Sequence, residues 1–282
     1  MPELPEVETI RRRLAPRVEG RTLERFEVVD ARWGEPLAPA ELEDAVRGRR
    51  LERLGRRGKY LVAHLEDEVH LIMHLRMTGT VLYDADPSLG HVRVRVGLDD
   101  GHTLSWVDPR RFGTGQLALS DEALDAFMAA RLGAEPLTDE FTPGYLRAAA
   151  HGRRAPIKAF LLDQRRVAGV GNIYADEALF RARIHPLRPA GRLKGAQLEA
   201  LHAAVNDSLA AGIAAKGASI DDFRDPDGVQ GSFQHRLLVH LRAGEPCTRC
   251  GNVVVKMVAA GRGTYVCERC QPRPRGAGRR RR

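Results

Sequence analysis

The sequence predicts an α+β protein in which an antiparallel sheet region is followed by a helical region and a cysteine module. Within residues 22–120 the runs "HVRVRVGL" and "HTLSWV" flank the turn "DDG", a pattern typical of a β-hairpin. Residues 156–215 are alanine-rich with helical spacing, and all four cysteines lie between positions 247 and 270. At 282 residues and 43% hydrophobic content, the chain can bury a sizeable core.

The first element is a helix, indicated by "MPELPEVETIRRRLAP". Apolar residues recur at helical spacing at Val7, Ile10 and Leu14. Pro5 suits a first helical turn, where a missing N–H has no cost, and acidic residues precede basic ones as the helix dipole favours. The residues before Pro5, Pro2 and Glu3, should therefore lie just outside the N-terminus of this helix.

The sheet region continues with the strand-like runs "KYLVAHL" and "VHLIMHL", and we expect a sandwich or a flattened barrel. His70 and His74 would suggest a metal pair on a helix, but their surroundings are strand-like. Helical patterns return over 121–150, where "GAEPLTDEFTPG" is a plausible linker. The C-terminal "RPRGAGRRRR" is expected to be a disordered basic tail.

The charge of the chain points to nucleic acid. Its formal net charge is +8, and arginine suits bidentate contacts to phosphate. A basic surface that serves solubility is the alternative. No signal peptide and no run of about 18 apolar residues is visible. Because no cysteine remains for a distant disulfide, a reducing cytoplasm fits.

The cysteines form the pattern "CTRC", sixteen residues, "CERC". Two such knuckles predict one structural zinc ion with four thiolate ligands, Cys247, Cys250, Cys267 and Cys270. The residues between the knuckles read as a β-hairpin with Arg262 at a glycine-flanked tip. That arginine is either a probe for phosphate or a groove, or a solvated turn residue.

Two glycine-containing loops are further candidates for contact with nucleic acid. In "VAGVGNIYADEALF", glycines break one helix and Asn172 can cap the next, which would create an anion site. In "DPRRFGTG", two arginines and an aromatic residue suit insertion into a duplex. An ordinary helix connection and a plain β-turn are the respective alternatives.

The N-terminus itself is a candidate nucleophile. Methionine before proline is normally removed, which would expose Pro2 as a secondary amine with a reference pKa of about 8. Attack of this amine on a sugar C1′ gives an iminium, which is an electron sink for elimination. Glu3 beside it could move protons. A plain lead-in to the helix is the alternative.

The motifs "MPELPEVETI", "RRGKYL", "HLRMTGT", "DPRRFG", "GVGNIYADEALF" and "GRGTYVCERCQ" occur in this order. Together they resemble bacterial formamidopyrimidine-DNA glycosylase, a family that repairs oxidised purines, from residue 2 to about 271. The resemblance implies a β-sandwich with the proline helix, a helix–two-turn–helix domain and a four-cysteine zinc finger. The corresponding boundaries are 1–133, 134–236 and 237–272, with the tail at 273–282.

The resemblance also implies roles for particular residues. Pro2 would be the Schiff-base nucleophile and Glu3 the proton donor, with Lys59 near the lesion and Arg262 assisting δ-elimination. Further residues would line the site or contact DNA. Glu6 and Glu177 would line the site; Met77, Arg110 and Phe112 would fill the gap left by the flipped base; and Lys158, Asn172, Arg153 and His91 would contact DNA.

We therefore expect a bifunctional glycosylase and abasic-site lyase with one structural zinc, no organic cofactor and no membrane association. It would be a monomer acting on double-stranded DNA with oxidised bases or abasic sites, in the bacterial cytoplasm and at the nucleoid. An endonuclease VIII-like enzyme for oxidised pyrimidines is one alternative, although Leu4 stands where that group has glycine. A non-catalytic DNA-binding relative is the other.

Three segments depart from the usual family pattern. Arg76 and Lys216 stand where glycine is common, and His240–Leu241 replace a tyrosine and a glycine. These departures bear on the shape of the lesion-covering loop and the entry to the zinc finger. The chemistry itself should be unaffected.

Overall fold

The computed structural model describes residues 1–220 and 223–274, which form two compact units. The first unit comprises Met1–Arg131 and Gly212–Gln234, and the second contains Leu132–Ala211 and the described residues after Gln234. The sequence prediction had included Gly212–Gln234 in the second domain. This segment groups with the first unit because it bonds to helix α1 (Leu4–Val18) and strand β5 (Thr80–Tyr83), as in the hydrogen bond from the Tyr83 amide to the Pro226 carbonyl (3.0 Å). The domain limits of the sequence analysis remain predictions.

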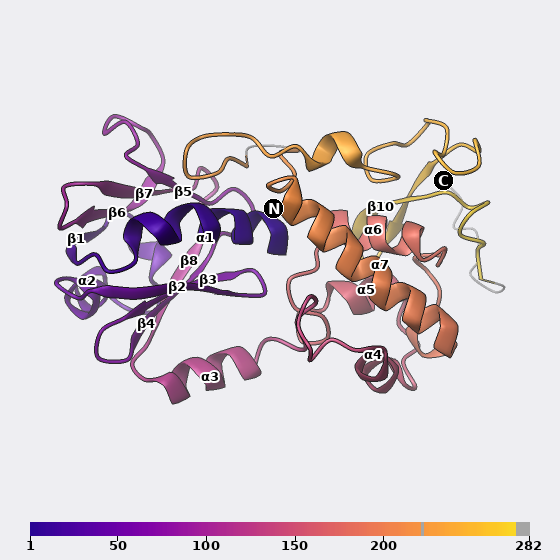
Figure 1. Ribbon diagram of the computed structural model, residues 1–282, viewed down its shortest axis with the longest axis horizontal. Helices are drawn as coiled ribbons and strands as arrows, with labels where there is room; N and C mark the ends of the chain where they lie inside the picture. The colour runs from indigo at the N-terminus through magenta and orange to yellow at the C-terminus, as the bar shows by residue number, and fades with distance from the viewer. Residues whose placement is uncertain (221–222, 275–282) are drawn as a thin grey trace. The chain divides into compact units, whose positions relative to one another are not determined.

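The first unit is built around two four-stranded antiparallel sheets (Figure 1). One sheet has the order β1-β6-β7-β5 and the other β2-β3-β4-β8. The strands are β1 (Leu23–Val28), β2 (Leu51–Arg57), β3 (Tyr60–Leu65), β4 (Val69–His74), β5 (Thr80–Tyr83), β6 (Val92–Leu98), β7 (Thr103–Val107) and β8 (Thr114–Ala118).

The hairpin predicted from alternation is confirmed as β6 and β7, which pair antiparallel. Val92 and Val94 are buried, whereas the arginines that follow each of them are only partly buried. Successive side chains on a strand point to opposite faces, so the valines face the core and the arginines lie on the other face of the sheet. Gly101 makes the turn with a φ of +86°, a conformation that glycine adopts without strain.

One apolar core lies between the two sheets and confirms the sandwich. Its members come from both sheets and from the helices α1 (Leu4–Val18) and α2 (Pro39–Val46). Val7, Ile10 and Leu14, the periodic residues of the predicted first helix, are fully buried in this core. Helix α3 (Asp121–Ala129) covers a smaller cluster on β3, β4 and β8. A short 3-10 helix, η1 (Ala31–Trp33), contributes Trp33 to the main core.

The second unit is helical and carries the cysteine module. Its helices are α4 (Pro143–Ala150), α5 (Ile157–Leu162), α6 (Asn172–Arg181) and most of α7 (Gly195–Ala214), with 3-10 turns η2 (Ala190–Arg192) and η3 (Phe233–Arg236). The hairpin between the cysteine knuckles is formed by β9 (Val255–Ala259) and β10 (Arg262–Val266). Asn172, expected to cap α6, is instead its first residue, because Gly171 takes the N-cap position.

No helix within the described residues has the length and apolar character that a membrane span needs. Residues 275–282 of the predicted basic tail lie outside the described residues.

All three positions at which glycine would be usual have left-handed backbone. The φ angles are +55° at Arg76, +58° at Lys216 and +62° at Leu241. This region costs an L-residue roughly 1–2 kcal/mol, which glycine does not incur. These three residues therefore adopt a backbone conformation that suits glycine, and their backbone is strained.

We predict that Leu241→Gly stabilises the second unit by about 0.5–1 kcal/mol. Strain is relieved, while the added freedom of the unfolded chain offsets part of the gain. Leu241 is 49% exposed, so little packing is lost. Leu241→Ala is the matched control, because it shortens the side chain and keeps the strain. Equal stabilities of the two variants in urea unfolding would count against this explanation.

Candidate functional site

The N-terminal residues Pro2 and Glu3 lie immediately before α1, where the sequence placed them. Both are buried, and Glu3 is the N-cap residue with extended backbone. Its amide donates to Glu6 Oε2 (2.8 Å), and Glu6 Oε1 accepts from the amide of Ala218 (2.7 Å). Glu6 therefore fixes the start of α1 and the segment around Ala218 together. The positive end of the helix dipole is directed at Pro2.

Lys59 lies in the two-residue turn between β2 and β3 and is almost fully buried. Gly58 precedes it with a φ of +57°, which the first central position of a type II′ hairpin turn requires. Arg56 donates through Nη1 to the Gly58 carbonyl (3.0 Å) and through Nε to Glu8 on α1 (2.9 Å). The turn that carries Lys59 is thus tied to the helix that carries Pro2.

Electrostatics around this turn are set by a few buried groups. Burial alone would raise the pKa of Glu8, but hydrogen bonds from Arg11, Arg12 and Arg56 outweigh it and hold that pKa at about 2. Burial lowers the pKa of His74 to about 3, and the positive charges of Arg76 and Lys59 add to this effect. His74 is therefore neutral and contributes no further positive charge beside Lys59.

The residues predicted to fill the gap left by a flipped base lie in two loops of the first unit. Arg110 is exposed, Phe112 is 51% exposed, and the guanidinium carbon of Arg110 lies 5.0 Å from the centre of the Phe112 ring. Met77 is half-buried, and His91 is exposed with a φ of +66°. Because both side chains are exposed, neither contributes to the hydrophobic core.

The four cysteines come together as the spacing predicted. Their Sγ atoms lie within 4.8 Å of one another, with Cys247 and Cys270 at 3.9 Å and Cys250 and Cys267 at 3.5 Å. Four sulfurs at about 2.3 Å around a tetrahedral zinc lie about 3.8 Å apart. The donor set and spacing fit one structural zinc ion, and the four thiolates fill its coordination sphere.

We predict that the protein purified without added metal contains close to one zinc per chain. Cys250→Ser should lose the metal, because three thiolates and a hydroxyl bind zinc far more weakly, and should bind DNA more weakly. Elemental analysis and a DNA-binding titration check both. A variant that lacks zinc yet binds and cuts DNA normally would contradict the assignment.

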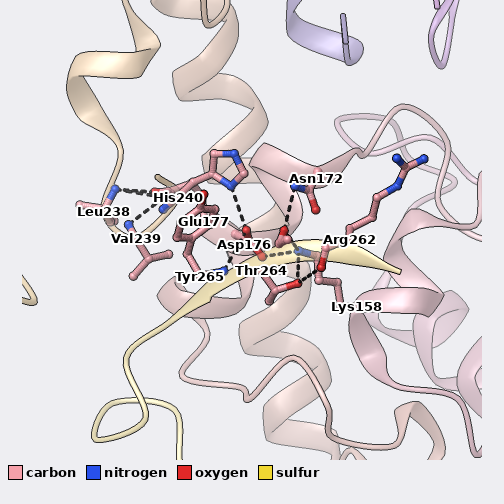
Figure 2. Close-up of polar contacts among 11 residues, drawn as sticks. Lys158, Asn172, Asp176, Glu177, Leu238, Val239, His240, Arg262, Thr264 and Tyr265 are labelled. Carbon is pink, nitrogen blue, oxygen red and sulfur yellow. Dashed lines mark hydrogen bonds and ion pairs between the residues drawn. The ribbon is translucent and has the colours of Figure 1, made fainter. Parts of the chain in front are cut away.

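A buried polar network holds the hairpin of β9 and β10 (Figure 2). The Lys158 ammonium is fully buried and donates to Asp176 Oδ1 (2.7 Å), Thr264 Oγ1 (2.7 Å) and the Gly263 carbonyl (3.3 Å). Asn172 Nδ2 donates to the same carbonyl at 3.0 Å. A direct phosphate contact does not fit this placement of Lys158, because its charge is paired and shielded from solvent.

Two adjacent acidic residues on α6 complete the network. Asp176 Oδ2 accepts from His240 Nδ1 (2.8 Å) and from the Tyr265 amide (3.3 Å). Glu177 is also fully buried, and its carboxylate accepts three consecutive backbone amides, those of residues 238–240, at 2.9–3.0 Å. Burial raises the pKa of Glu177. A role in lining an active site does not fit Glu177, because its oxygens are engaged by backbone in the interior of the second unit.

Arg262 is the first residue of β10, and its exposed side chain extends away from this network in Figure 2. Lys158 and Asn172 both hold the carbonyl of the next residue, Gly263, and so fix the backbone at the hairpin tip. Arg153 is half-buried and donates through Nε to the Ala149 carbonyl (2.7 Å).

Sequence reasoning missed the roles of Asp176 and His240. The available signal was two acidic residues in the run "IYADEALF", whose other members are apolar, since acidic groups in such surroundings are almost never buried without partners. His240 had been noted only as a departure from a pattern. Its contact with Asp176 and its edge-on packing against Tyr265, with ring centres 4.9 Å apart, give it a structural role.

Comparisons with known proteins agree along the chain. Residues 1–115 match the formamidopyrimidine-DNA glycosylase N-terminal domain, 132–224 match the H2TH domain of the same enzymes, and 244–273 match the zinc finger found in FPG and IleRS. The formamidopyrimidine-DNA glycosylase of Heliobacterium modesticaldum is 44% identical over 96% of this chain and 100% of its own length. That of Chloroflexus aggregans is 46% identical over 96% and 98%.

Solved structures of such enzymes also match nearly the whole chain. MutM (Fpg) from Thermus thermophilus has 42% identity and a TM-score of 0.86, covering 96% of this chain and 98% of that one. Lactococcus lactis Fpg in complex with DNA that contains an abasic site has 34% identity and a TM-score of 0.90, covering 96% and 100%. A complex of the same protein with Fapy-dG-containing DNA has a TM-score of 0.89.

Proposed function

Because this chain belongs to the formamidopyrimidine-DNA glycosylase family, we propose that it excises oxidised purines, namely 8-oxoguanine and formamidopyrimidines, from duplex DNA through its N-terminal proline. The chain is a base-excision repair glycosylase with abasic-site lyase activity. The observation that supports the nucleophile is the buried Pro2–Glu3 pair at the positive end of α1. DNA binding would also associate the protein with the nucleoid.

The proposed reaction begins when Pro2, freed of Met1, attacks C1′ of the damaged nucleotide. The bond from C1′ to the base breaks, and the base leaves with a proton supplied by Glu3. Opening of the sugar ring then gives an iminium joining Pro2 to the DNA. This cation acidifies the C2′–H bond: a base in the site takes that proton, and the electron pair expels the 3′ phosphate by β-elimination. Loss of the C4′ proton to a base then expels the 5′ phosphate by δ-elimination.

Other residues of the chain would assist this chemistry. Lys59 is carried on a turn tied to α1 through Arg56 and Glu8, which supports a position near the reacting sugar. Arg262, exposed at the fixed tip of the zinc-finger hairpin, would hold a phosphate flanking the lesion and aid its departure. Glu6 would keep the start of α1 in register with the segment around Ala218.

A base cannot react inside the helix stack, so the damaged nucleotide would be flipped out. Met77, Arg110 and Phe112 would fill the resulting gap, and we call these three residues the wedge. The exposure of the stacked Arg110 and Phe112 side chains supports this role. His91, Arg153 and Asn172 would contact the DNA backbone. Lys158 and Glu177, which are both fully buried, would act by supporting the fold around the hairpin tip and not by touching DNA.

The test is incubation with duplexes that carry 8-oxoguanine, a formamidopyrimidine, an oxidised pyrimidine or an abasic site. We expect excision of both purine lesions and cleavage on both sides of the abasic site. Faster excision of the oxidised pyrimidine than of either purine would support the endonuclease VIII-like alternative. Tight binding without any product would indicate a non-catalytic relative.

A further inference from the structure

Asp108 is fully buried just after β7, at the start of the loop that carries Arg110 and Phe112. Its Oδ2 accepts from the amides of Phe112 (2.9 Å) and Gly113 (2.7 Å). Its Oδ1 accepts from the hydroxyl of Thr78 (2.5 Å) and from the amide of Arg110 (3.3 Å). One carboxylate therefore binds both loops that carry the wedge, since Thr78 directly follows Met77.

The backbone of Asp108 extends the same connections. Its amide donates to the carbonyl of His91 (3.0 Å), and its own carbonyl accepts from Arg93 Nε (2.8 Å). Asp108 is thus connected to every non-catalytic residue of this unit for which a DNA contact is predicted. His91, Arg110 and Phe112 bond to it directly, and Met77 precedes its partner Thr78.

The loop packs closely against this carboxylate. A side chain at Gly113 would begin 3.0 Å from the Trp106 ring and 3.1 Å from Asp108 Oδ2, so any larger residue would require these neighbours to move by a few tenths of an ångström. Arg111 has a φ of +60° and is tied through Nε to buried Asp30 (2.6 Å). Arg111 is thereby held by Asp30, while its neighbours Arg110 and Phe112 stay exposed and stacked on each other.

We propose that Asp108 is a positioning residue that pre-organises the wedge, and through it sets how the enzyme discriminates the base opposite the lesion. This inference rests on the proposed function of Met77, Arg110 and Phe112. Hydrogen bonds from N–H and O–H donors to an ionised carboxylate are the strong kind, and four of them converge here. Without them the exposed loops would have to be ordered on each encounter with DNA, which lowers the fraction of productive complexes.

The experiment compares Asp108→Asn with the parent, in the full chain with zinc bound. The amide keeps the size but replaces one acceptor by a donor that faces N–H groups. We expect excision of 8-oxoguanine to fall by roughly tenfold to a hundredfold. We also expect the preference for the opposite base to be reduced as far as in the Arg110→Ala/Phe112→Ala variant. Cleavage at a preformed abasic site should stay within about threefold, because no damaged base has to be flipped out of the stack there.

The distinguishing readout is a double-mutant cycle. Added to Arg110→Ala/Phe112→Ala, the Asp108→Asn change should cost much less excision than it does in the parent, because of the three wedge side chains only Met77 then remains to be positioned. Asp84→Asn is the matched control, since Asp84 likewise accepts a backbone amide, that of Thr103 at 2.8 Å, away from these loops. It should leave discrimination unchanged. If Asp108→Asn does not fold, Thr78→Val removes one of the four donors and should weaken discrimination by about threefold.

Parental opposite-base preference in a folded Asp108→Asn protein would overturn the inference. So would an equal loss of excision with and without the wedge side chains, because that would mean a general structural effect. Failure of the proposed function would look different, since the parent protein itself would then excise no lesion. If Arg110→Ala/Phe112→Ala without the Asp108 change kept the parental opposite-base preference, that would contradict both the wedge role and this inference.

Discussion

An enzyme that keeps Met1, or that carries glycine and serine before Pro2, should lose base excision and abasic-site cleavage by at least about a thousandfold. The chain extension converts the secondary amine of Pro2 into an amide, which has no nucleophilic lone pair. The fold should not change, because Met1 is 40% exposed and the buried contacts of α1 begin after it. Single-turnover rates on both substrates measure the loss.

A matched control adds the same residues at the C-terminal end, where activity should be parental. The melting temperature and the zinc content of the N-terminal variant should equal those of the parent. An extended enzyme that worked at the parental rate would mean that Pro2 is only a lead-in to the helix.

The second large effect concerns Asp176. Asp176→Asn should destabilise the second unit by about 3–5 kcal/mol, because it removes the carboxylate charge that the fully buried Lys158 ammonium pairs with at 2.7 Å. The same change loosens the hold on Gly263 and hence on Arg262, so DNA affinity should also fall. Urea unfolding, with zinc release as a second probe, measures the loss of stability.

Asp207→Asn, the same chemical change on the exposed side of α7, should change stability by no more than about 0.5 kcal/mol. Lys158→Met/Asp176→Asn should recover much of the stability, since the buried ammonium is then removed together with its carboxylate partner. Equal losses in the single and double variants would contradict the importance of the buried pair.

The structural features that depend on residues close together in the sequence could be predicted. Alternating valines and arginines predicted β6 and β7, helical spacing predicted α1, and the cysteine spacing predicted a zinc site whose geometry the sulfur distances satisfy. Each of these rests on residues that lie close together in the sequence. The physical rule for each is local, so the sequence suffices.

The buried network was not predictable for the opposite reason. Lys158 meets Thr264 across 106 positions and Asp176 meets His240 across 64. From the sequence alone, a lysine in a basic chain is expected to face solvent and phosphate. Only the folded structure shows that its partners bury it, and the same holds for Glu177 and for Asp108, whose motif was read for its arginines.

The most direct test of the account is to trap the reaction with borohydride on a duplex that carries 8-oxoguanine and to map the adduct by peptide sequencing. Reduction of the iminium would fix the enzyme to C1′ of the DNA by a stable amine bond. The account predicts a single adduct on the peptide that begins at Pro2, and none with the N-terminally extended enzyme. Attachment at Lys59 or at another lysine, with the extended enzyme trapped equally well, would contradict it.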